Sequence, residues 1–301
     1  MRRFGKTDLM VSPLGFGGAP IGVLDTDAHA VRTVLSQMLD SGANVIDTAA
    51  CYYGSEEVIG RAIAHRRSEF VLITKCGHTV EEGDARPEFS PAVITESIDR
   101  SLTRLRSDVI DVVLLHSCSL DILKQGDALA AAVAARDAGK VRFVGYSGDN
   151  EAAAWACTQP DIAVLQTSVS ICDQANIENA IAAAQRHDVG VMAKRPIANA
   201  AWKTPTEQYE RYQSYAQPYC DRFAAMDLKD PPDGETWASH ALRFTLSVAG
   251  VHTAIIGTTR LDHVRANVEA ARRGRLANAE VKHLRDAFTR AQPEEGWSGL
   301  T

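Results

Sequence analysis

Short apolar runs alternate with longer helical stretches over nearly the whole of this 301-residue chain. Each apolar run has the length of a strand, and such alternation is typical of βα units around a parallel sheet. The expected strands are 12–18, 43–47, 70–75, 109–116, 141–147, 162–168, 189–194 and 252–257. Eight alternations suit a (β/α)₈ TIM barrel, whose usual size is about 250 residues. We therefore predict an α/β fold with one barrel domain over residues 1–301, and an open doubly wound sheet is the alternative.

Helix signals fall between the expected strands. One helix closes at Gly42, one opens at Ser55 as its N-cap, one opens at Ser90 and Pro91, and one closes at Gly139. Further helices are expected over 151–157, 175–187, 236–249 and 262–273.

The segment 196–235 is longer than the usual loop after a barrel strand. We interpret it as an extended loop after strand seven that forms a lid. The spacing of its tyrosines favours packing over the lining of a sugar or aromatic pocket. Its aromatic residues include Trp202, Tyr209, Tyr212, Tyr215 and Tyr219. The tail after Arg290 either carries Trp297 across the mouth of the barrel or is loose.

Composition excludes several classes of function. The net charge is −6 without long runs of one sign, so nucleic acid is not an expected partner. No apolar run approaches the roughly 20 residues of a membrane helix, and the N-terminus has no signal-like apolar region, so a cytoplasmic location is expected. No metal or disulfide framework is expected, because the cysteines are scattered and form no CxxC pair. They are Cys51, Cys76, Cys118, Cys157, Cys172 and Cys220.

Ionisable and polar residues end the expected strands, where barrels carry their chemistry. Asp47, Lys75 and His116 end three successive strands. Ser147, Gln166, Lys194 and Gly257 lie at the ends of the later ones. Taken singly, each has a structural explanation, such as a turn cap, an ion-paired lysine or a hydrogen-bonded core histidine. Together they favour function, because burying ionisable groups is costly.

Tyr52 lies five residues after Asp47, in the loop that leaves the second strand. A tyrosine hydroxyl acts as a general acid at neutral pH only when a neighbour stabilises the phenolate, and the cation of Lys75 suits that role. Asp47 would hold Lys75, and His116 would bind a substrate oxygen or relay a proton. The constellation favours proton donation to a carbonyl oxygen.

A hydride donor is then required, and the usual nucleotide motifs are absent. In GFGGAPIG (15–22), Pro20 stands where a GxGxxG motif needs its last glycine. A second turn is better suited: Gly257, Thr258, Thr259 and Arg260 join an apolar run to a helix. Backbone amides, two hydroxyls and a guanidinium there suit a phosphate, and an ordinary N-cap turn is the alternative.

These residues resemble the aldo-keto reductase family over nearly the whole chain. The resemblance rests on NVIDTAACYYGSEEVIG (44–60), VLITKCG (71–77), DVVLLHS (111–117) and VRFVGYS (141–147). It implies a (β/α)₈ barrel that binds NAD(P)H and transfers hydride to an aldehyde or ketone, or runs in reverse on an alcohol or sugar. It also implies the catalytic tetrad Asp47, Tyr52, Lys75 and His116.

The resemblance further implies the cofactor contacts. Ser147 and Gln166 would hold the nicotinamide carboxamide, and Gly18 and Ala19 would line its site. The adenosine end would be held by Gly257, Thr258, Thr259, Arg260, His263 and Asn267, which favours NADP(H) and permits NAD(H).

The chain departs from the family pattern at several positions. Tyr53 takes the place of the family's usual glycine and is the alternative proton donor. Gly148 follows Ser147 where the family commonly has Asn. Lys194 or Arg195 faces the cofactor region where many members have an aromatic ring, and would meet a pyrophosphate or an acidic substrate, or pair with the long segment.

Two other functions remain as alternatives. One is a Schiff-base aldolase that uses Lys75 or Lys194 as nucleophile. The other is an NADPH-binding regulatory subunit without turnover. The substrate is a small carbonyl or alcohol compound that the sequence does not specify further, and the oligomeric state is left open.

Overall fold

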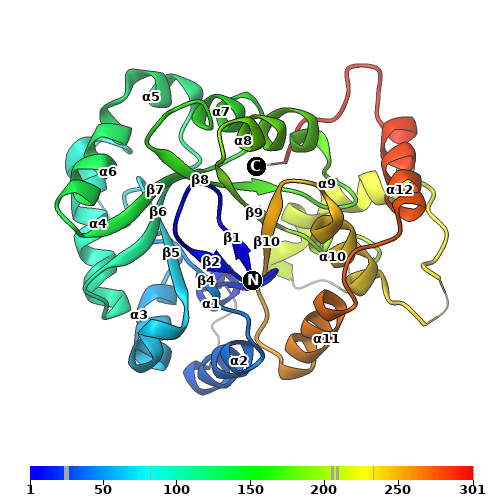
Figure 1. The fold of residues 1–301 in the computed structure, drawn as a ribbon, viewed down its shortest axis with the longest axis horizontal. Coiled ribbons are helices and arrows are strands. Elements are labelled where there is room, and N and C mark those ends of the chain that lie inside the picture. The colour runs from blue at the N-terminus through cyan, green and yellow to red at the C-terminus, as the bar shows by residue number, and fades with distance from the viewer. Residues whose placement is uncertain (24–26, 82, 205–206, 208–209, 233, 301) are drawn as a thin grey trace.

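Eight parallel strands close into a barrel in the computed structural model, which describes residues 1–23, 27–81, 83–204, 207, 210–232 and 234–300 (Figure 1). The barrel strands are β3 (Leu14–Gly17), β4 (Val45–Asp47), β5 (Val71–Cys76), β6 (Ile110–His116), β7 (Val141–Ser147), β8 (Ile162–Ser168), β9 (Gly190–Lys194) and β10 (Val251–Ile256). Each pairs with its sequence neighbour, and β10 pairs with β3 to close the ring. The barrel prediction is confirmed, and the open sheet is excluded.

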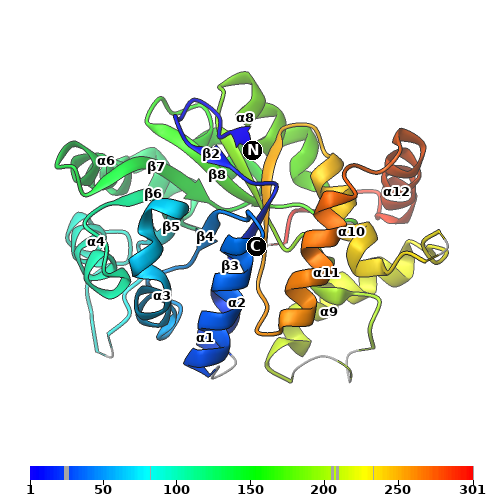
Figure 2. The same ribbon diagram turned by 60° about the horizontal axis from the view of Figure 1, so that its bottom comes forward.

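Helices surround the barrel, as Figures 1 and 2 show from two sides. They are α1 (Ala19–Val23), α2 (Ala28–Asp40), α3 (Ser55–Ile63), α4 (Pro91–Leu105), α5 (Leu120–Gln125), α6 (Asp127–Asp137), α7 (Asn150–Ala156), α8 (Ala182–Arg186), α9 (Glu210–Ala225), α10 (Trp237–Ser247), α11 (Leu261–Arg272) and α12 (Asn278–Ala291). In α2, buried Val31, Val34, Leu35 and Met38 recur at helical spacing and face the barrel. The Asp27 side chain caps that helix by accepting a hydrogen bond from the Ala30 amide at 3.1 Å.

A short N-terminal hairpin closes one end of the barrel. Its strands are β1 (Arg2–Arg3) and β2 (Met10–Val11). Phe4, Leu9 and Val11 pack with barrel-interior side chains in one apolar cluster. The N-terminal end of the barrel is therefore filled, and the polar strand ends lie at the other end.

The segment 196–235 is partly helical, which corrects its interpretation as an extended loop. After the 3₁₀ turn η3 (Ala198–Ala200), the chain forms α9, which contacts η3. Tyr219 on α9 is buried, as its spacing predicted, whereas Tyr215 is 41% exposed. Tyr209 lies outside the described residues, and the side chain of Tyr212 is not described.

Two helix predictions need correction, and some helices were missed. The hydroxyl of Ser55 caps nothing, because Gly54 is the N-cap of α3 and Ser55 donates instead to the Gly18 carbonyl at 3.0 Å. The helix expected over 175–187 starts as a π-helical turn, η2 (Ile177–Ile181), and only then continues as α8. Helices α5 and α12 were not predicted.

The C-terminal tail is docked against the barrel. Gly299 exchanges hydrogen bonds with the Asn150 side chain, and the Leu300 amide donates to Asp173 at 3.0 Å. Trp297 packs edge-on against Phe288, and the Arg222 guanidinium lies 5.0 Å from its ring centroid. The tail is therefore held in place, and the alternative that it is loose is wrong.

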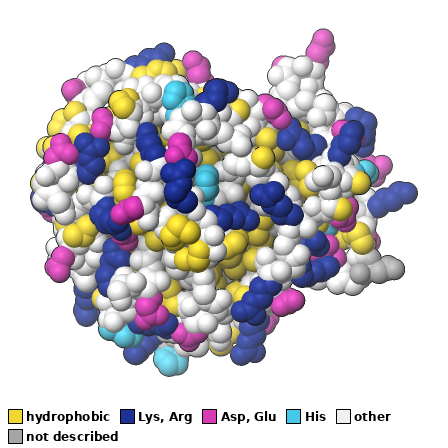
Figure 3. Space-filling model, viewed as in Figure 1, with side chains coloured by type: hydrophobic (Ala, Val, Ile, Leu, Met, Phe, Trp, Pro, Cys, Tyr) yellow, Lys and Arg dark blue, Asp and Glu magenta, His cyan; other side chains and the backbone are white. Residues whose placement is uncertain are grey.

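Basic and acidic side chains lie interspersed on the face seen in Figure 3, with apolar side chains between them. Among the described helices, none is long and apolar enough to cross a bilayer. Four of the cysteines are buried free thiols, namely Cys76, Cys118, Cys157 and Cys172.

Candidate active site

Asp47 and Lys75 form a buried ion pair at the C-terminal ends of β4 and β5. The Lys75 Nζ lies 2.8 Å from both carboxylate oxygens and donates a further bond to the Thr48 carbonyl at 2.7 Å. The Lys75 side chain is 0% exposed and the Asp47 side chain is 3% exposed. Burial alone would lower the pKa of Lys75, but Asp47 and Tyr52 outweigh it and raise that pKa above the ordinary lysine value. Lys75 is therefore a permanent cation.

A chain of hydrogen bonds extends from this pair to β7 and β8. The Gln166 side-chain amide donates to the Asp47 Oδ1 at 2.9 Å, and the Ser147 hydroxyl donates to the Gln166 Oε1 at 2.9 Å. Strand register explains the contact, because Ser147 pairs directly with Gln166. Four of the predicted residues thus form one buried network.

Tyr52 lies beside the ion pair, in the loop between β4 and α3. Its ring centroid is 5.0 Å from the Lys75 Nζ. Burial raises the pKa of Tyr52 above its ordinary value, while the Lys75 cation opposes that rise. Tyr53, by contrast, is 89% exposed. The structure therefore brings Tyr52 into the cluster and leaves the alternative, Tyr53, outside it.

His116 ends β6 and meets Tyr52 edge to face, with ring centroids 5.8 Å apart. Its Nδ1 lies 3.3 Å from the Cys51 Sγ, and its ring is 5.1 Å from that of His78. Burial, with Lys75 and His78, lowers the pKa of His116 to about 2. His116 is therefore a neutral imidazole. The sequence reasoning missed Cys51 and His78.

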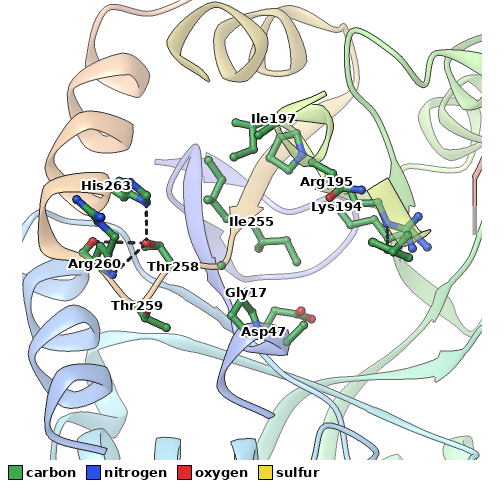
Figure 4. A pocket seen from close by; sticks show the side chains of 18 of the residues that line it. Gly17, Asp47, Lys194, Arg195, Ile197, Ile255, Thr258, Thr259, Arg260 and His263 are labelled. Atoms are coloured by element: carbon green, nitrogen blue, oxygen red, sulfur yellow. Dashed lines mark hydrogen bonds between the residues drawn. The ribbon is translucent and has the colours of Figure 1, made fainter. Parts of the chain in front are cut away.

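A cavity of about 360 Å³ opens beside Tyr52 and extends to the turn after β10 (Figure 4). Of the predicted residues, its lining includes Ala19, Asp47, Tyr52, Gln166, Lys194, Arg195, Gly257, Thr258, Thr259, Arg260 and His263. Gly18, Lys75, His116, Ser147 and Asn267 are not among the described lining residues. Gly18 lies just behind the wall, where its amide donates to the Asp47 carbonyl at 2.7 Å.

The far end of the cavity is rich in cations and hydroxyls. The Thr258 hydroxyl accepts from the Arg260 amide at 3.1 Å and lies 3.3 Å from the His263 Nδ1. The Arg260 guanidinium is exposed and paired with Asp262 at 2.6 Å. Lys203 also lines this end. The pKa of His263 is lowered mainly by burial, and the charges of Arg260 and Lys203 lower it further. Sequence reasoning did not single out Lys203.

Lys194 forms an ion pair with the carboxylate of Asp149. Its Nζ lies 2.9 Å from the Asp149 Oδ2, and Asp149 also accepts bonds from the Thr167 hydroxyl, the Ser168 amide and the Asn176 side chain. Lys194 lines the cavity, and its charge is paired there with Asp149.

Arg195 is held by the long segment and the tail. Its guanidinium donates to the Tyr215 hydroxyl and stacks over the Tyr215 ring at 4.9 Å. It also donates to the Ser168 hydroxyl at 2.7 Å and to the Leu300 carbonyl. Tyr215 lines the same cavity, so its expected role in packing alone is wrong.

Comparisons with known proteins identify the family of the chain. The model of the Aldo/keto reductase family matches residues 13–288. The chain is 27% identical to the uncharacterized oxidoreductase YqkF of Bacillus subtilis over 94% of both chains. It is 25% identical to L-galactose dehydrogenase of Arabidopsis thaliana, over 90% of this chain and 87% of that protein.

A solved structure is similar in fold as well as in sequence. The aldo-keto reductase AKR11C1 from Bacillus halodurans, in its holo form, superposes with a TM-score of 0.82 at 28% identity and covers 95% of both chains. With the matching family model and the barrel described above, this likeness settles the assignment. The chain belongs to the aldo/keto reductase family of oxidoreductases.

Proposed function

We propose that this protein reduces an aldehyde or ketone with NADPH, and that Tyr52 donates the proton to the carbonyl oxygen. The observation that carries the proposal is the position of Tyr52. It stands over the buried Lys75–Asp47 pair at one end of a cavity whose other end is cationic. NADH is a weaker alternative donor.

The cavity residues fit a nicotinamide dinucleotide. Its cationic end offers Thr258, Thr259, Arg260, His263 and Lys203 to a phosphate. Pro20 packs against Gly257 in the cavity wall. A Cβ at position 257 would lie 2.5 Å from the proline ring, so this position of the wall requires glycine. The end near Gln166 and Ala19 suits a nicotinamide carboxamide.

When bound, the reduced nicotinamide supplies a hydride to the carbonyl carbon. Tyr52 gives its proton to the carbonyl oxygen as that oxygen gains negative charge. The Lys75 cation then stabilises the resulting phenolate, and Asp47 holds Lys75 in place and charged. Solvent returns the proton to Tyr52 after the product alcohol leaves.

His116 orients the carbonyl as a neutral hydrogen-bond donor. Burial raises the pKa of the Cys51 thiol, so that thiol remains protonated. An imidazole nitrogen accepts hydrogen bonds better than sulfur does, so the thiol donates to the Nδ1. The proton of His116 then resides on the Nε2.

The Schiff-base alternative is disfavoured by the state of both lysines. Lys75 keeps its charge beside Asp47 and is fully buried. Burial lowers the pKa of Lys194, but its amine is bound to Asp149. A lysine nucleophile must be neutral and accessible, and neither residue meets both conditions.

The test is a fluorescence titration of the protein with NADPH and, separately, with NADH, using its four tryptophans as energy donors. We expect saturable binding with tighter affinity for NADPH, followed by NADPH oxidation when an aldehyde is added. Binding without turnover of any carbonyl would instead support the regulatory subunit. Failure to bind either nucleotide would contradict the proposal.

A further inference from the structure

Arg195 differs from the other cations near the candidate active site. Lys75 has Asp47 as its counter-ion, Lys194 has Asp149, and Arg222 lies 3.8 Å from Asp173. For Arg195, no carboxylate lies within ion-pair distance in the part of the chain that the structure describes.

The partners of Arg195 are neutral oxygens. The guanidinium donates through one terminal nitrogen and Nε to Ser168, Leu300 and Tyr215. Its other terminal nitrogen makes no hydrogen bond to a described residue. A half-buried guanidinium that forms no ion pair with a carboxylate of the described residues favours binding of an anion, since buried charges in proteins are normally paired.

The backbone conformation of Arg195 also favours a functional role for this residue. Arg195 has a φ of 58°, in the left-handed region that non-glycine residues seldom adopt. Such strain concentrates at functional sites, where it serves to aim a side chain. The side chain is then fixed by the stacked Tyr215 ring and the docked tail, so the guanidinium is held before a ligand arrives.

A second polar group near Arg195 lacks a partner. The Tyr219 hydroxyl lies one helical turn from Tyr215 on α9, in a side chain that is 1% exposed. Within the described ranges it makes no hydrogen bond. Both tyrosines interact electrostatically with Arg195.

Arg195 also lies close to the reacting groups. It lines the same cavity as Tyr52. Burial is the main cause of the lowered pKa of His116, and the charge of Arg195 is a smaller cause. Figure 4 shows Lys194 and Arg195 on the side of the cavity opposite Thr258, Arg260 and His263. The guanidinium is therefore placed at the end of the cavity away from the phosphate-binding turn.

We propose that Arg195 binds a carboxylate of the substrate, so that the preferred substrates are carbonyl compounds that carry a carboxylate group. This inference rests on the proposed carbonyl reduction. A carboxylate matches the planar guanidinium fork and brings one negative charge to a cation that has no ion-pair partner among the described residues. A phosphate would bring nearly two charges, which this end of the cavity does not balance.

The test compares substrates that differ in the anionic group alone. Steady-state kinetics are measured with 4-carboxybenzaldehyde and with its neutral analogue 4-carbamoylbenzaldehyde, at saturating NADPH. The proteins are wild type, Arg195→Met, Arg195→Lys and, as the matched control, Arg260→Met at the other end of the cavity. Because each aldehyde is compared with itself across proteins, its intrinsic reactivity cancels.

We expect wild type to prefer the carboxylate, and Arg195→Met to lower kcat/KM for it by roughly 10- to 100-fold while sparing the amide. Arg195→Lys should restore part of the preference, and Arg260→Met should change NADPH affinity but not the ratio of the two aldehydes. Equal losses for both aldehydes, or weaker NADPH binding in Arg195→Met, would make Arg195 a cofactor contact and overturn the inference. A ratio of the two kcat/KM values that is the same in wild type and Arg195→Met would likewise overturn it.

A binding arm separates this inference from the proposed function. Calorimetric titration measures 4-carboxybenzaldehyde binding to wild type and to Arg195→Met. If no aldehyde is reduced, yet wild type binds this probe and Arg195→Met does not, the anion site stands and the proposed reaction is wrong. If both proteins bind it equally, the anion site is wrong whatever the activity.

Discussion

The Lys75 ammonium lies 2.8 Å from both oxygens of the Asp47 carboxylate, and the two side chains are buried, with 0% of Lys75 and 3% of Asp47 exposed. Isolated charges are costly to bury, so each residue requires the other. Tyr52 stands over this pair, with its ring centroid 5.0 Å from the Lys75 Nζ. The pair thus places a fixed cation beside the phenol proposed to donate the proton.

Breaking the pair should destabilise the fold. Asp47→Asn leaves the buried Lys75 cation without a counter-ion and should lower the free energy of unfolding by roughly 3–5 kcal/mol, measured by urea denaturation. The double variant Asp47→Asn, Lys75→Met removes the charge as well and should recover much of that loss. A single Asp47→Asn variant as stable as wild type would mean that Lys75 is not held charged.

Tyr52→Phe should abolish carbonyl reduction. The substitution removes the proton donor and little else, so kcat should fall by roughly 10²- to 10⁴-fold with NADPH affinity nearly unchanged. Tyr53→Phe is the matched control, because Tyr53 is 89% exposed and should tolerate the change. If Tyr52→Phe kept its activity and Tyr53→Phe lost it, the proton donor would be reassigned.

Arg260→Ala should weaken NADPH more than NADH. Arg260 lines the cationic end of the cavity, and loss of a charge-assisted contact to the 2′-phosphate should raise the Kd for NADPH about 10-fold. Arg265→Ala, also on α11 but outside the described cavity lining, should leave both affinities unchanged. Equal losses for the two nucleotides would remove the assigned 2′-phosphate contact.

His116 should make stability depend on pH. Its pKa is about 2 in the folded chain, against 6.5 in the unfolded chain. Below pH 6.5 the unfolded chain therefore binds a proton at His116 that the folded chain does not bind. The free energy of unfolding should therefore be largest above pH 6.5 and fall as the pH drops through that value, by up to about 2 kcal/mol at pH 5.

The comparison for this prediction is His116→Asn, measured by denaturation at pH 5 and pH 7.5. The other histidines remain in both proteins, so their contributions cancel in the difference. The pH dependence should be weaker in the variant. Identical slopes in the two proteins would mean that His116 is protonated as easily in the folded chain as in the unfolded one.

The barrel strands could be predicted because both of their faces are buried, which makes them continuous apolar runs. The expected runs 141–147 and 162–168 coincide with β7 and β8. The N-terminal hairpin was missed because its strands are two residues long and carry no periodicity. Helix α12 was missed because its sequence is largely polar, with Leu284, Ala287 and Phe288 as its buried residues.

Strand ends in a barrel converge, and for this reason Asp47, Lys75 and His116 could be placed together from the sequence. The partners supplied by loops could not. Cys51 reaches the His116 Nδ1 through the turn after β4, and Tyr215 reaches Arg195 from a helix twenty residues along the chain. No short-range pattern encodes either contact.

The central claim is that this site transfers a hydride from the nicotinamide to a carbonyl carbon. The most direct measurement is the reduction of 4-carboxybenzaldehyde with NADPH that carries two deuterium atoms at C4, followed by mass spectrometry of the product alcohol. We expect one deuterium in each alcohol molecule and one NADPH consumed for each. An unlabelled alcohol, or no alcohol from this or any other aldehyde while NADPH is bound, would contradict it.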